Sequence, residues 1–163
     1  MTDKKIGLMG CGTVAGYGHI PAIIATPGLK LAAVYDPDPK RLAAALQLGT
    51  DMLAFDNPTA FFESGLDAVV VTSPAPNHYE NVADAARYGL PVLCEKPLAI
   101  EMDEAEAIVS LMEQAGLPLF VGFNYRFSPC ALEIKSLLAE GAIGDVRSLR
   151  LVYNWNLHGK TIL

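Results

Sequence analysis

Short apolar runs alternate with helical stretches along most of this 163-residue chain, and this alternation constrains the fold more than any other feature. Several of the runs are apolar throughout, as expected for strands that are buried on both faces. Such strands belong to a parallel sheet covered by helices on both sides. The sequence predicts strands at residues 5–9, 29–35, 52–55, 68–71, 92–94 and 119–122.

Helix start and stop signals lie between these predicted strands. Three helices open at Asp38-Pro39, Asn57-Pro58 and Ser128-Pro129, because each pair places a capping side chain before a proline at the first helical position. Asn77, with Glu80 three residues later, predicts a capping box at the start of another helix. A further helix, at residues 101–116, has an apolar stripe formed by Ala105, Ile108, Met112 and Ala115. Strands and helices in this order predict a doubly wound α/β fold with a parallel sheet, of the Rossmann type.

The pattern changes after Gly122. One helix follows, and alternating apolar residues then predict a long strand at residues 146–155. Because one strand is not stable alone, we interpret it as the start of a second, incomplete sheet. We therefore expect a dinucleotide-binding domain at residues 1–122, followed at residues 123–163 by the first helix and strand of a truncated second α/β domain. The open edge of that strand also predicts a homo-oligomer.

Composition excludes several classes of partner. The net charge is −6 and the basic residues form no cluster, so nucleic acid is not expected as a partner. No apolar run approaches the roughly 20 residues that a membrane-spanning helix needs, so no membrane partner is expected. The cysteines, Cys11, Cys94 and Cys130, lack metal-ligand spacing. This pattern favours reduced thiols in a cytoplasmic protein and predicts no metal site.

A glycine loop, Gly10-Cys11-Gly12-Thr13-Val14-Ala15, follows the first predicted strand and opens a helix. It matches the G-x-G-x-x-G/A pattern: Gly10 permits the tight turn, Gly12 lets a pyrophosphate approach the backbone, and Ala15 lets the helix lie close to the strand. The helix N-terminus offers N–H groups to the phosphates. The pattern makes Gly10, Cys11, Gly12, Thr13 and Val14 candidate cofactor-binding residues. The alternative is a glycine turn that binds no ligand.

Asp36 ends the second predicted strand, about 20 residues beyond the glycine loop, where a carboxylate binds the hydroxyls of the adenosine ribose. The same carboxylate would repel a 2′-phosphate, so NAD is favoured as the cofactor over NADP. Lys40 and Arg41 lie close enough in the sequence to keep NADP open. The alternative for Asp36 is a turn residue that precedes Pro37.

Three further segments follow the ends of predicted strands: Thr72-Ser73-Pro74-Ala75-Pro76-Asn77-His78, Glu95-Lys96-Pro97 and Gly122-Phe123-Asn124-Tyr125-Arg126-Phe127. Together with the glycine loop, they resemble the glucose–fructose oxidoreductase and inositol dehydrogenase family, known as Gfo/Idh/MocA. The resemblance covers nearly the whole chain, and Glu-Lys-Pro is its most specific motif. In an open parallel sheet, ligands bind outside these strand ends, so the resemblance and the topology point to one cleft.

The resemblance implies an NAD(P)-dependent oxidoreductase that transfers hydride between nicotinamide and a hydroxyl carbon of a sugar or polyol. Lys96 is similar to the family's active-site lysine and would exchange the hydroxyl proton as the catalytic acid–base group. Its alternative is a solvated surface lysine. Glu95 is similar to a ligand of the nicotinamide ribose. A cis peptide before Pro97 would aim Lys96 inward, although the trans form is commoner.

The other matched residues also have structural alternatives. The resemblance implies that Thr72, Ser73, Pro74 and His78 line the cofactor cleft, but a residue in the first helical turn is an equal interpretation of His78. Asn124 and Arg126 match a hinge segment near nicotinamide and substrate, and a structural ion pair is an equal interpretation of Arg126. For His19, which falls where many relatives have a histidine, we expect a role in helix packing.

The chain departs from the family in its second domain, which in the family supplies substrate contacts and further acid–base residues. His158 does not match the family's catalytic histidine motif. We therefore expect NAD binding, and no turnover by this chain alone. The alternative is a catalytically incomplete nucleotide-binding or regulatory module, and a third possibility is another nucleotide in the same crevice.

Overall fold

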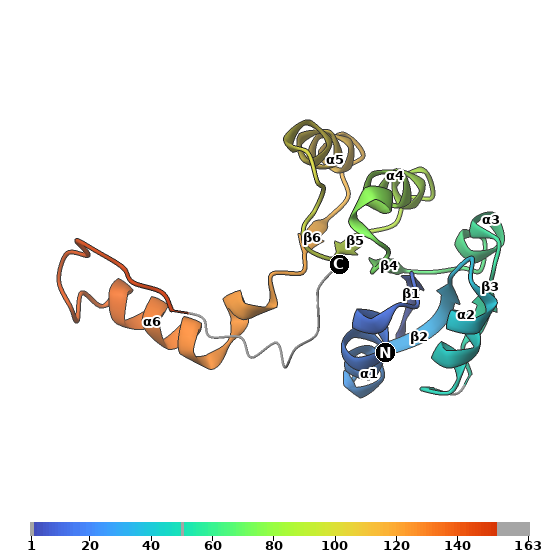
Figure 1. Cartoon of the computed structure of the whole chain (residues 1–163), viewed down its shortest axis with the longest axis horizontal. Helices are drawn as coiled ribbons and strands as arrows, with labels where there is room; N and C mark the ends of the chain where they lie inside the picture. Colours follow the sequence, from blue (N-terminus) through green and yellow to red (C-terminus); the bar gives the residue numbers. More distant parts are fainter. Residues whose placement is uncertain (1, 50, 153–163) are drawn as a thin grey trace, which may run out of the picture. The chain divides into compact units, whose positions relative to one another are not determined.

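The chain divides into two compact units, Met1–Phe123 and Asn124–Leu163, of which the computed structural model describes residues 2–49 and 51–152. The first unit is built on a six-stranded parallel sheet with the strand order β3-β2-β1-β4-β5-β6 (Figure 1). The expected strand positions and the doubly wound class are confirmed, with strand ends displaced by about one residue. The strands are β1 (Lys4–Met9), β2 (Leu29–Tyr35), β3 (Leu53–Phe55), β4 (Ala68–Val71), β5 (Val92–Cys94) and β6 (Leu119–Val121).

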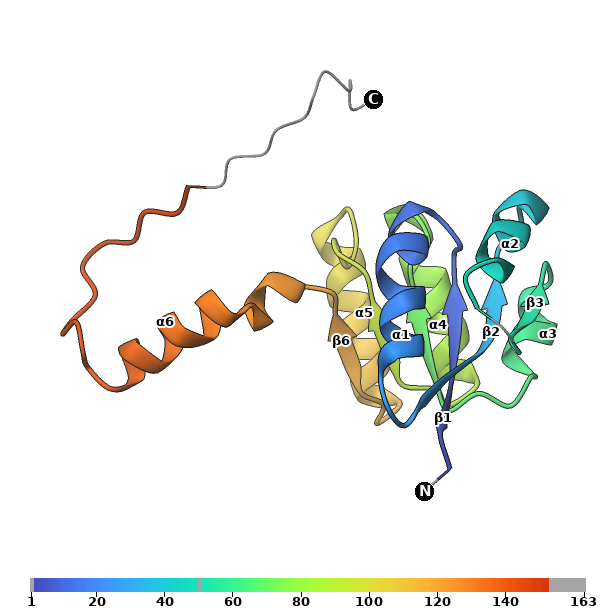
Figure 2. The same ribbon diagram turned by 90° about the horizontal axis from the view of Figure 1, so that it is seen from below.

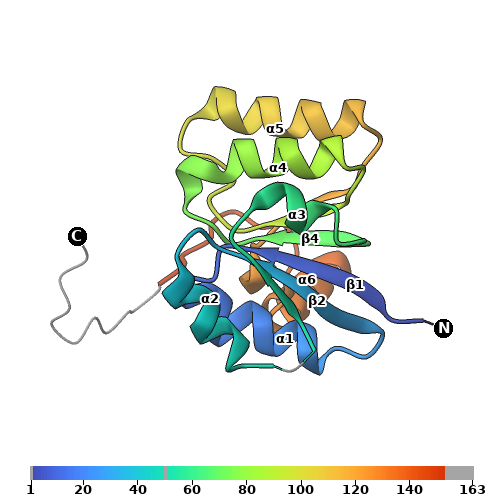
Figure 3. The ribbon, with the colours of Figure 1, turned by 90° about the vertical axis from the view of Figure 1, so that its right-hand side faces the viewer.

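Helices cover both faces of the sheet (Figures 2 and 3). One face carries α1 (Ile20–Ala25), which continues the π-helical turn η1 (Ala15–His19), and α2 (Pro39–Leu46). The other face carries α3 (Pro58–Phe62), α4 (His78–Arg87), which follows the 3₁₀ turn η2 (Ala75–Asn77), and α5 (Met102–Gln114). Because the strand order reverses between β1 and β4, the connections that leave these neighbouring strands turn to opposite faces and leave a crevice at their carboxyl ends.

The side chains of the central strands alternate between two apolar cores. In β4, Val70 packs with the core on the α1 face, whereas Val69 and Val71 pack with the core on the α4 face. Phe61 of α3 is fully buried beneath β1, where a Cβ on Gly7 would lie 2.6 Å from its ring. Full burial of a side chain of this size contributes about 1.5–3 kcal/mol, so these two cores hold the strand ends in register.

Three predicted helix caps are confirmed and one is wrong. Asp38, Asn57 and Ser128 each accept a hydrogen bond from a backbone N–H in the first turn of their helix. Asn77 makes no side-chain capping bond, so the predicted capping box is absent at α4. A capping residue needs extended backbone for its side chain to fold back onto the helix, whereas Asn77 (φ −98°, ψ −4°) ends the 3₁₀ turn η2.

The second unit contains the 3₁₀ turn η3 (Asn124–Phe127) and α6 (Pro129–Ala139). The predicted strand at residues 146–155 is wrong over residues 146–152, which have irregular backbone, and residues 153–155 lie outside the described residues. A strand requires a hydrogen-bonded neighbour, and no described residue pairs with this segment. Leu149 and Leu151 are accordingly 83% and 86% exposed. None of the helices within residues 2–49 and 51–152 combines the length and the hydropathy that a membrane-spanning helix needs.

Candidate functional site

The glycine loop lies at the carboxyl end of β1, where it meets the loop that follows β4. Gly10 has φ +93°, and a Cβ at this position would lie 2.5 Å from the backbone nitrogen of Ser73, so only glycine fits. At Gly12, a Cβ would meet no atom within 4 Å, which leaves its backbone open. Ala15 is fully buried. The tight turn, the open backbone and the close helix expected from the sequence are therefore all present.

A helix begins at Thr13 and runs through η1 into α1. Thr13 and Val14 thus occupy the first helical turn, whose N–H groups have no acceptor within the helix. The backbone N–H of Gly16 donates to the carbonyl oxygen of Gly12 at 3.1 Å, and this bond joins the loop to the helix. The first turn therefore offers backbone donors beside the open face of Gly12.

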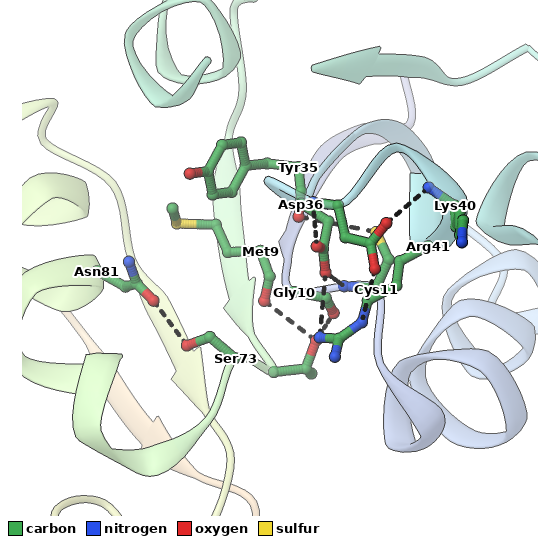
Figure 4. Close-up of polar contacts among 11 residues, drawn as sticks. Met9, Gly10, Cys11, Tyr35, Asp36, Lys40, Arg41, Ser73 and Asn81 are labelled. Atoms are coloured by element: carbon green, nitrogen blue, oxygen red, sulfur yellow. Dashed lines mark hydrogen bonds and ion pairs between the residues drawn. The ribbon is translucent and has the colours of Figure 1, made fainter. Parts of the chain in front are cut away.

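Asp36 connects the end of β2 to the glycine loop. Its buried carboxylate accepts a hydrogen bond at Oδ2 from the backbone N–H of Cys11 (2.8 Å) and one at Oδ1 from that of Asp38 (2.9 Å) (Figure 4). The guanidinium of Arg41 lies between two carboxylates, 3.9 Å from Oδ2 of Asp36 and 3.7 Å from Oδ2 of Asp38. Each carboxylate oxygen of Asp36 retains a further acceptor site, so the same side chain can also receive a ligand hydroxyl.

Two hollows adjoin the glycine loop, and Asp36 lines the smaller one. One, of about 290 Å³, lies at the ends of β1, β2 and β4, and its lining includes Gly10, Asp36, Pro37 and Pro74. The other, of about 550 Å³, separates the loop from α2 and is lined in part by Gly12, Thr13, Lys40 and Arg41. The volume of the larger hollow is within the usual range of about 300–1,000 Å³ for small-molecule and cofactor sites, and the smaller hollow is just below the lower limit of that range.

The residues after β4 make contacts that hold this edge of the site together. Thr72 donates its hydroxyl proton toward the carbonyl oxygens of Met9 and Gly10, at 3.1 and 2.5 Å. Ser73 donates from its hydroxyl to Oδ1 of Asn81 at 2.6 Å (Figure 4).

His78 joins two loops at this edge. It is buried, with Nε2 2.9 Å from the carbonyl oxygen of Ser73 and Nδ1 3.0 Å from that of Pro97. The ring therefore links the loop after β4 to the Glu-Lys-Pro segment.

Glu95 lies in the Glu-Lys-Pro segment after β5 and has a partner that sequence reasoning missed. Its Oε1 lies 2.8 Å from Nε2 of His19, and its Oε2 accepts a hydrogen bond from the backbone N–H of Lys96 at 2.9 Å. The Lys96–Pro97 peptide is cis, and the side chain of Lys96 is exposed. His19 itself was visible in the sequence, in the helix after the glycine loop. Its contact with Glu95 was not, because the two residues are 76 positions apart.

Asn124 and Arg126 belong to the second unit, within η3. Arg126 lines a hollow of about 240 Å³ together with Phe127 and the α6 residues Ala131, Leu132 and Lys135. Within the part of the chain that the structure describes, Arg126 forms no ion pair, which was the structural alternative for this residue.

The three cysteines are free thiols. Burial raises the pKa of Cys11 to about 12; the negative charge of Asp36 acts in the same direction and Arg41 opposes it. Burial also raises the pKa of Cys94 to about 12, with a smaller contribution from Glu95. Over the described residues, no group of three or more His, Cys, Asp or Glu side chains is placed to hold a metal ion.

A family model described as "Oxidoreductase family, NAD-binding Rossmann fold" matches residues 4–123. The chain belongs to this family, Gfo/Idh/MocA. The match covers nearly the whole first unit, which is therefore the Rossmann domain of a Gfo/Idh/MocA protein. The resemblance inferred from the glycine loop and the Glu-Lys-Pro motif is confirmed.

Curated Gfo/Idh/MocA relatives include a D-apiose dehydrogenase of Rhizobium rhizogenes, 34% identical over 89% of this chain and 42% of that protein. Inositol 2-dehydrogenase 2 of Saccharopolyspora erythraea is 38% identical over 91% of this chain and 44% of that protein. The chain therefore spans less than half the length of these relatives.

Solved structures also match most of this chain over less than half of their own length. An oxidoreductase from Agrobacterium radiobacter, in complex with NAD+, L-tartaric acid and magnesium, superposes with a TM-score of 0.82 at 34% identity, over 88% of this chain and 42% of that one. A scyllo-inositol dehydrogenase from Lactobacillus casei, with bound NAD(H) and scyllo-inositol, gives 0.81 at 28% identity, over 88% and 43% of the two chains.

Proposed function

We propose that this chain binds NAD at the carboxyl ends of β1, β2, β4 and β5, as the cofactor-binding half of a dehydrogenase acting on a hydroxyl of a sugar or polyol. The glycine loop carries the proposal, because Gly10 fits only as glycine and the backbone of Gly12 is open. Membership of the Gfo/Idh/MocA family supports NAD, and the relatives named for D-apiose and inositol support the substrate class.

The proposal assigns groups of this chain to three parts of the dinucleotide: the adenosine ribose, the pyrophosphate and the nicotinamide end. Asp36 receives the ribose hydroxyls at the adenosine end, beside the 290 Å³ hollow. The backbone of residues 11–14 receives the pyrophosphate, and a Cβ at position 12 would fill the space that the phosphates need. In this proposal Thr72, Ser73, Pro74 and His78 form the wall of the crevice, and Glu95 acts at the nicotinamide end. The family resemblance assigns Asn124 and Arg126 of the second unit to cofactor binding as well.

When bound, NAD supplies the hydride acceptor for oxidation of a hydroxyl carbon. Lys96 has the acid–base role in the proposal: its Nζ exchanges the hydroxyl proton as the hydride leaves. Glu95 holds the backbone N–H of Lys96 at 2.9 Å and so fixes the start of this segment.

NAD is favoured over NADP because a buried carboxylate, Asp36, stands where a 2′-phosphate would lie. Arg41 does not offset this effect fully, since Asp36 and Asp38 already compensate its charge. NADP is the second choice of cofactor. Lys40 and Arg41, which line the 550 Å³ hollow, would then donate hydrogen bonds to its 2′-phosphate.

A catalytically incomplete nucleotide-binding or regulatory module is the second candidate function. The exposed side chain of Lys96 favours it, because a proton-transfer group works best where water is excluded. We further propose that the second unit is the beginning of a second α/β domain, and that the chain works in the cytoplasm.

Self-association is also part of the proposal. The sequence predicted self-association from an open strand edge, and residues 146–152 form no strand. Helix α6 supplies another reason, because it exposes a set of apolar side chains that an interface would cover. These are Leu132, Ile134, Leu137 and Leu138. Sedimentation that shows only monomer at micromolar concentration would contradict this part.

Calorimetric titration with NAD tests the main proposal. Gly12→Ala should weaken NAD binding by at least about tenfold with an unchanged melting temperature, because the added methyl group meets only the phosphates. Gly18→Ala is the matched control, since its Cβ also meets nothing within 4 Å but lies in the helix beyond the loop. Wild-type chain that binds neither NAD nor NADP would refute the proposal.

A further inference from the structure

We propose that His19 is a positioning residue that holds the Glu95 carboxylate in place for the nicotinamide ribose of the bound dinucleotide, a role that rests on the NAD binding proposed above. His19 ends the π-helical turn η1, and its Nε2 lies 2.8 Å from Oε1 of Glu95. π-Helical turns are rare and occur frequently at functional sites. The contact joins the helix after the glycine loop to the Glu-Lys-Pro segment.

The contact is sheltered from solvent. The side chains of His19 and Glu95 are 18% and 14% exposed. A hydrogen bond to a carboxylate is stronger than one between neutral groups, and water competes less for a sheltered pair. Because an ionised carboxylate only accepts hydrogen bonds, Nε2 of His19 is the donor.

The same carboxylate has a second hydrogen-bond partner, and it also occupies the space beside Gly122. Oε2 of Glu95 accepts from the backbone N–H of Lys96 at 2.9 Å. A Cβ on Gly122, at the end of β6, would lie 3.0 Å from Oε1 and 3.2 Å from the carboxylate carbon. The backbone of Gly122 does not require glycine, because its φ is not positive. Glycine is favoured at this position because the Glu95 carboxylate occupies the space that a side chain would need. Hydrogen bonds from η1 and from the β5 end thus hold one carboxylate, and a side chain at the β6 end would collide with it.

This convergence has a direct consequence for binding. A free glutamate side chain must lose rotamer freedom when it binds a ligand, and a glutamate already held by its neighbours loses less. Each oxygen of Glu95 still has acceptor capacity for a ribose hydroxyl. His19 therefore acts through Glu95 and needs no contact of its own with the cofactor.

Comparing the binding of NAD with that of ADP distinguishes this positioning role from a general structural role of His19. ADP contains the adenosine and pyrophosphate but lacks the second ribose, so only NAD reports on Glu95. By calorimetry, His19→Ala should weaken NAD binding by about tenfold and leave ADP binding within about twofold of wild type. Gly122→Ala, which displaces the carboxylate from the other side, should have the same selective effect. His19→Gln should restore most of the NAD affinity, since its amide can donate in place of Nε2.

Gly18→Ala, in the same helical turn, should change neither affinity, and melting temperatures show that each variant is folded. Equal losses for ADP and NAD in His19→Ala would show a distorted glycine loop and overturn the positioning role. An unchanged NAD affinity in His19→Ala would overturn it as well. Wild-type chain that binds no NAD would instead refute the proposed function on which the role rests.

A double-mutant cycle provides an independent check. In the His19→Ala background, Glu95→Gln should weaken NAD binding by much less than it does in the wild type, because the two residues act as one unit. Additive losses would mean that His19 acts without Glu95, and the proposal would fail.

Discussion

The carboxylate of Asp36 accepts a hydrogen bond from the backbone N–H of Cys11, a residue 25 positions earlier in the chain, at 2.8 Å. The bond joins the end of β2 to the glycine loop at the end of β1 (Figure 4). One side chain thus stabilises the loop and also stands where the proposed ribose would bind. Substitutions of Asp36 should therefore change loop stability and cofactor choice together.

Asp36→Ala should weaken NAD binding by about tenfold or more, because it removes both the ribose acceptor and the acceptor of the Cys11 N–H. NADP should lose much less affinity, since the repulsive charge disappears and Arg41 is freed from one of its two carboxylates. Parallel titrations with NAD and NADP measure the ratio. Asp38→Ala is the control: it also releases Arg41 from one of its two carboxylates but keeps Asp36, so a preference for NAD should remain. An unchanged ratio in Asp36→Ala would contradict the assignment of specificity to Asp36.

Gly10→Ala should unfold the chain at a lower denaturant concentration than Gly28→Ala. Both glycines have positive φ, +93° and +83°, so both substitutions carry a conformational cost of about 1–2 kcal/mol. Only at Gly10 would the new Cβ also lie 2.5 Å from a backbone atom, whereas at Gly28 it meets nothing within 4 Å. Urea unfolding curves measure the difference. Equal unfolding midpoints for the two variants would contradict the close approach of the loops that follow β1 and β4.

Cysteine reactivity should divide the three thiols into two classes. At pH 8, iodoacetamide should modify Cys130 in the folded chain and leave Cys11 and Cys94 largely intact. The reagent reacts with the thiolate, Cys130 is exposed, and burial raises the pKa of the other two thiols to about 12. Mass spectrometry of digested protein locates the label. Urea-unfolded protein is the control, and all three cysteines should react there.

Stability should fall as the pH rises above about 9. The folded chain keeps the protons of Cys11 and Cys94 up to a pKa of about 12, whereas the unfolded chain releases them near the ordinary value of 9. The unfolded state therefore binds fewer protons over this interval, and the free energy of unfolding decreases with rising pH. Urea unfolding at pH 7.5 and 10 measures the decrease, which Cys94→Ala should reduce. An equal decrease in that variant would assign the effect to other groups.

Local sequence patterns were enough to predict the order of the strands, their limits to within about one residue, the helix caps at Asp38, Asn57 and Ser128, and the family. These features depend on local patterns: the run of apolar residues in a buried strand, a capping side chain before proline, and short motifs such as the glycine loop. The glycine at position 10 was also predictable, since the turn requires it. Local patterns were insufficient at Asn77, where a preceding 3₁₀ turn replaced the expected cap.

The contacts between distant side chains depend on the three-dimensional fold. His19 and Glu95 are 76 residues apart, and Cys11 and Asp36 are 25 apart, so no local pattern specifies either contact. A parallel sheet brings the carboxyl ends of its strands to one edge, which places Asp36 beside the glycine loop, and the helical turn η1 that follows this loop carries His19 to Glu95. The predicted strand at residues 146–155 shows the reverse case. Its alternation was correct as a pattern, but a strand exists only beside a hydrogen-bonded neighbour, and no described residue of the chain supplies one to residues 146–152.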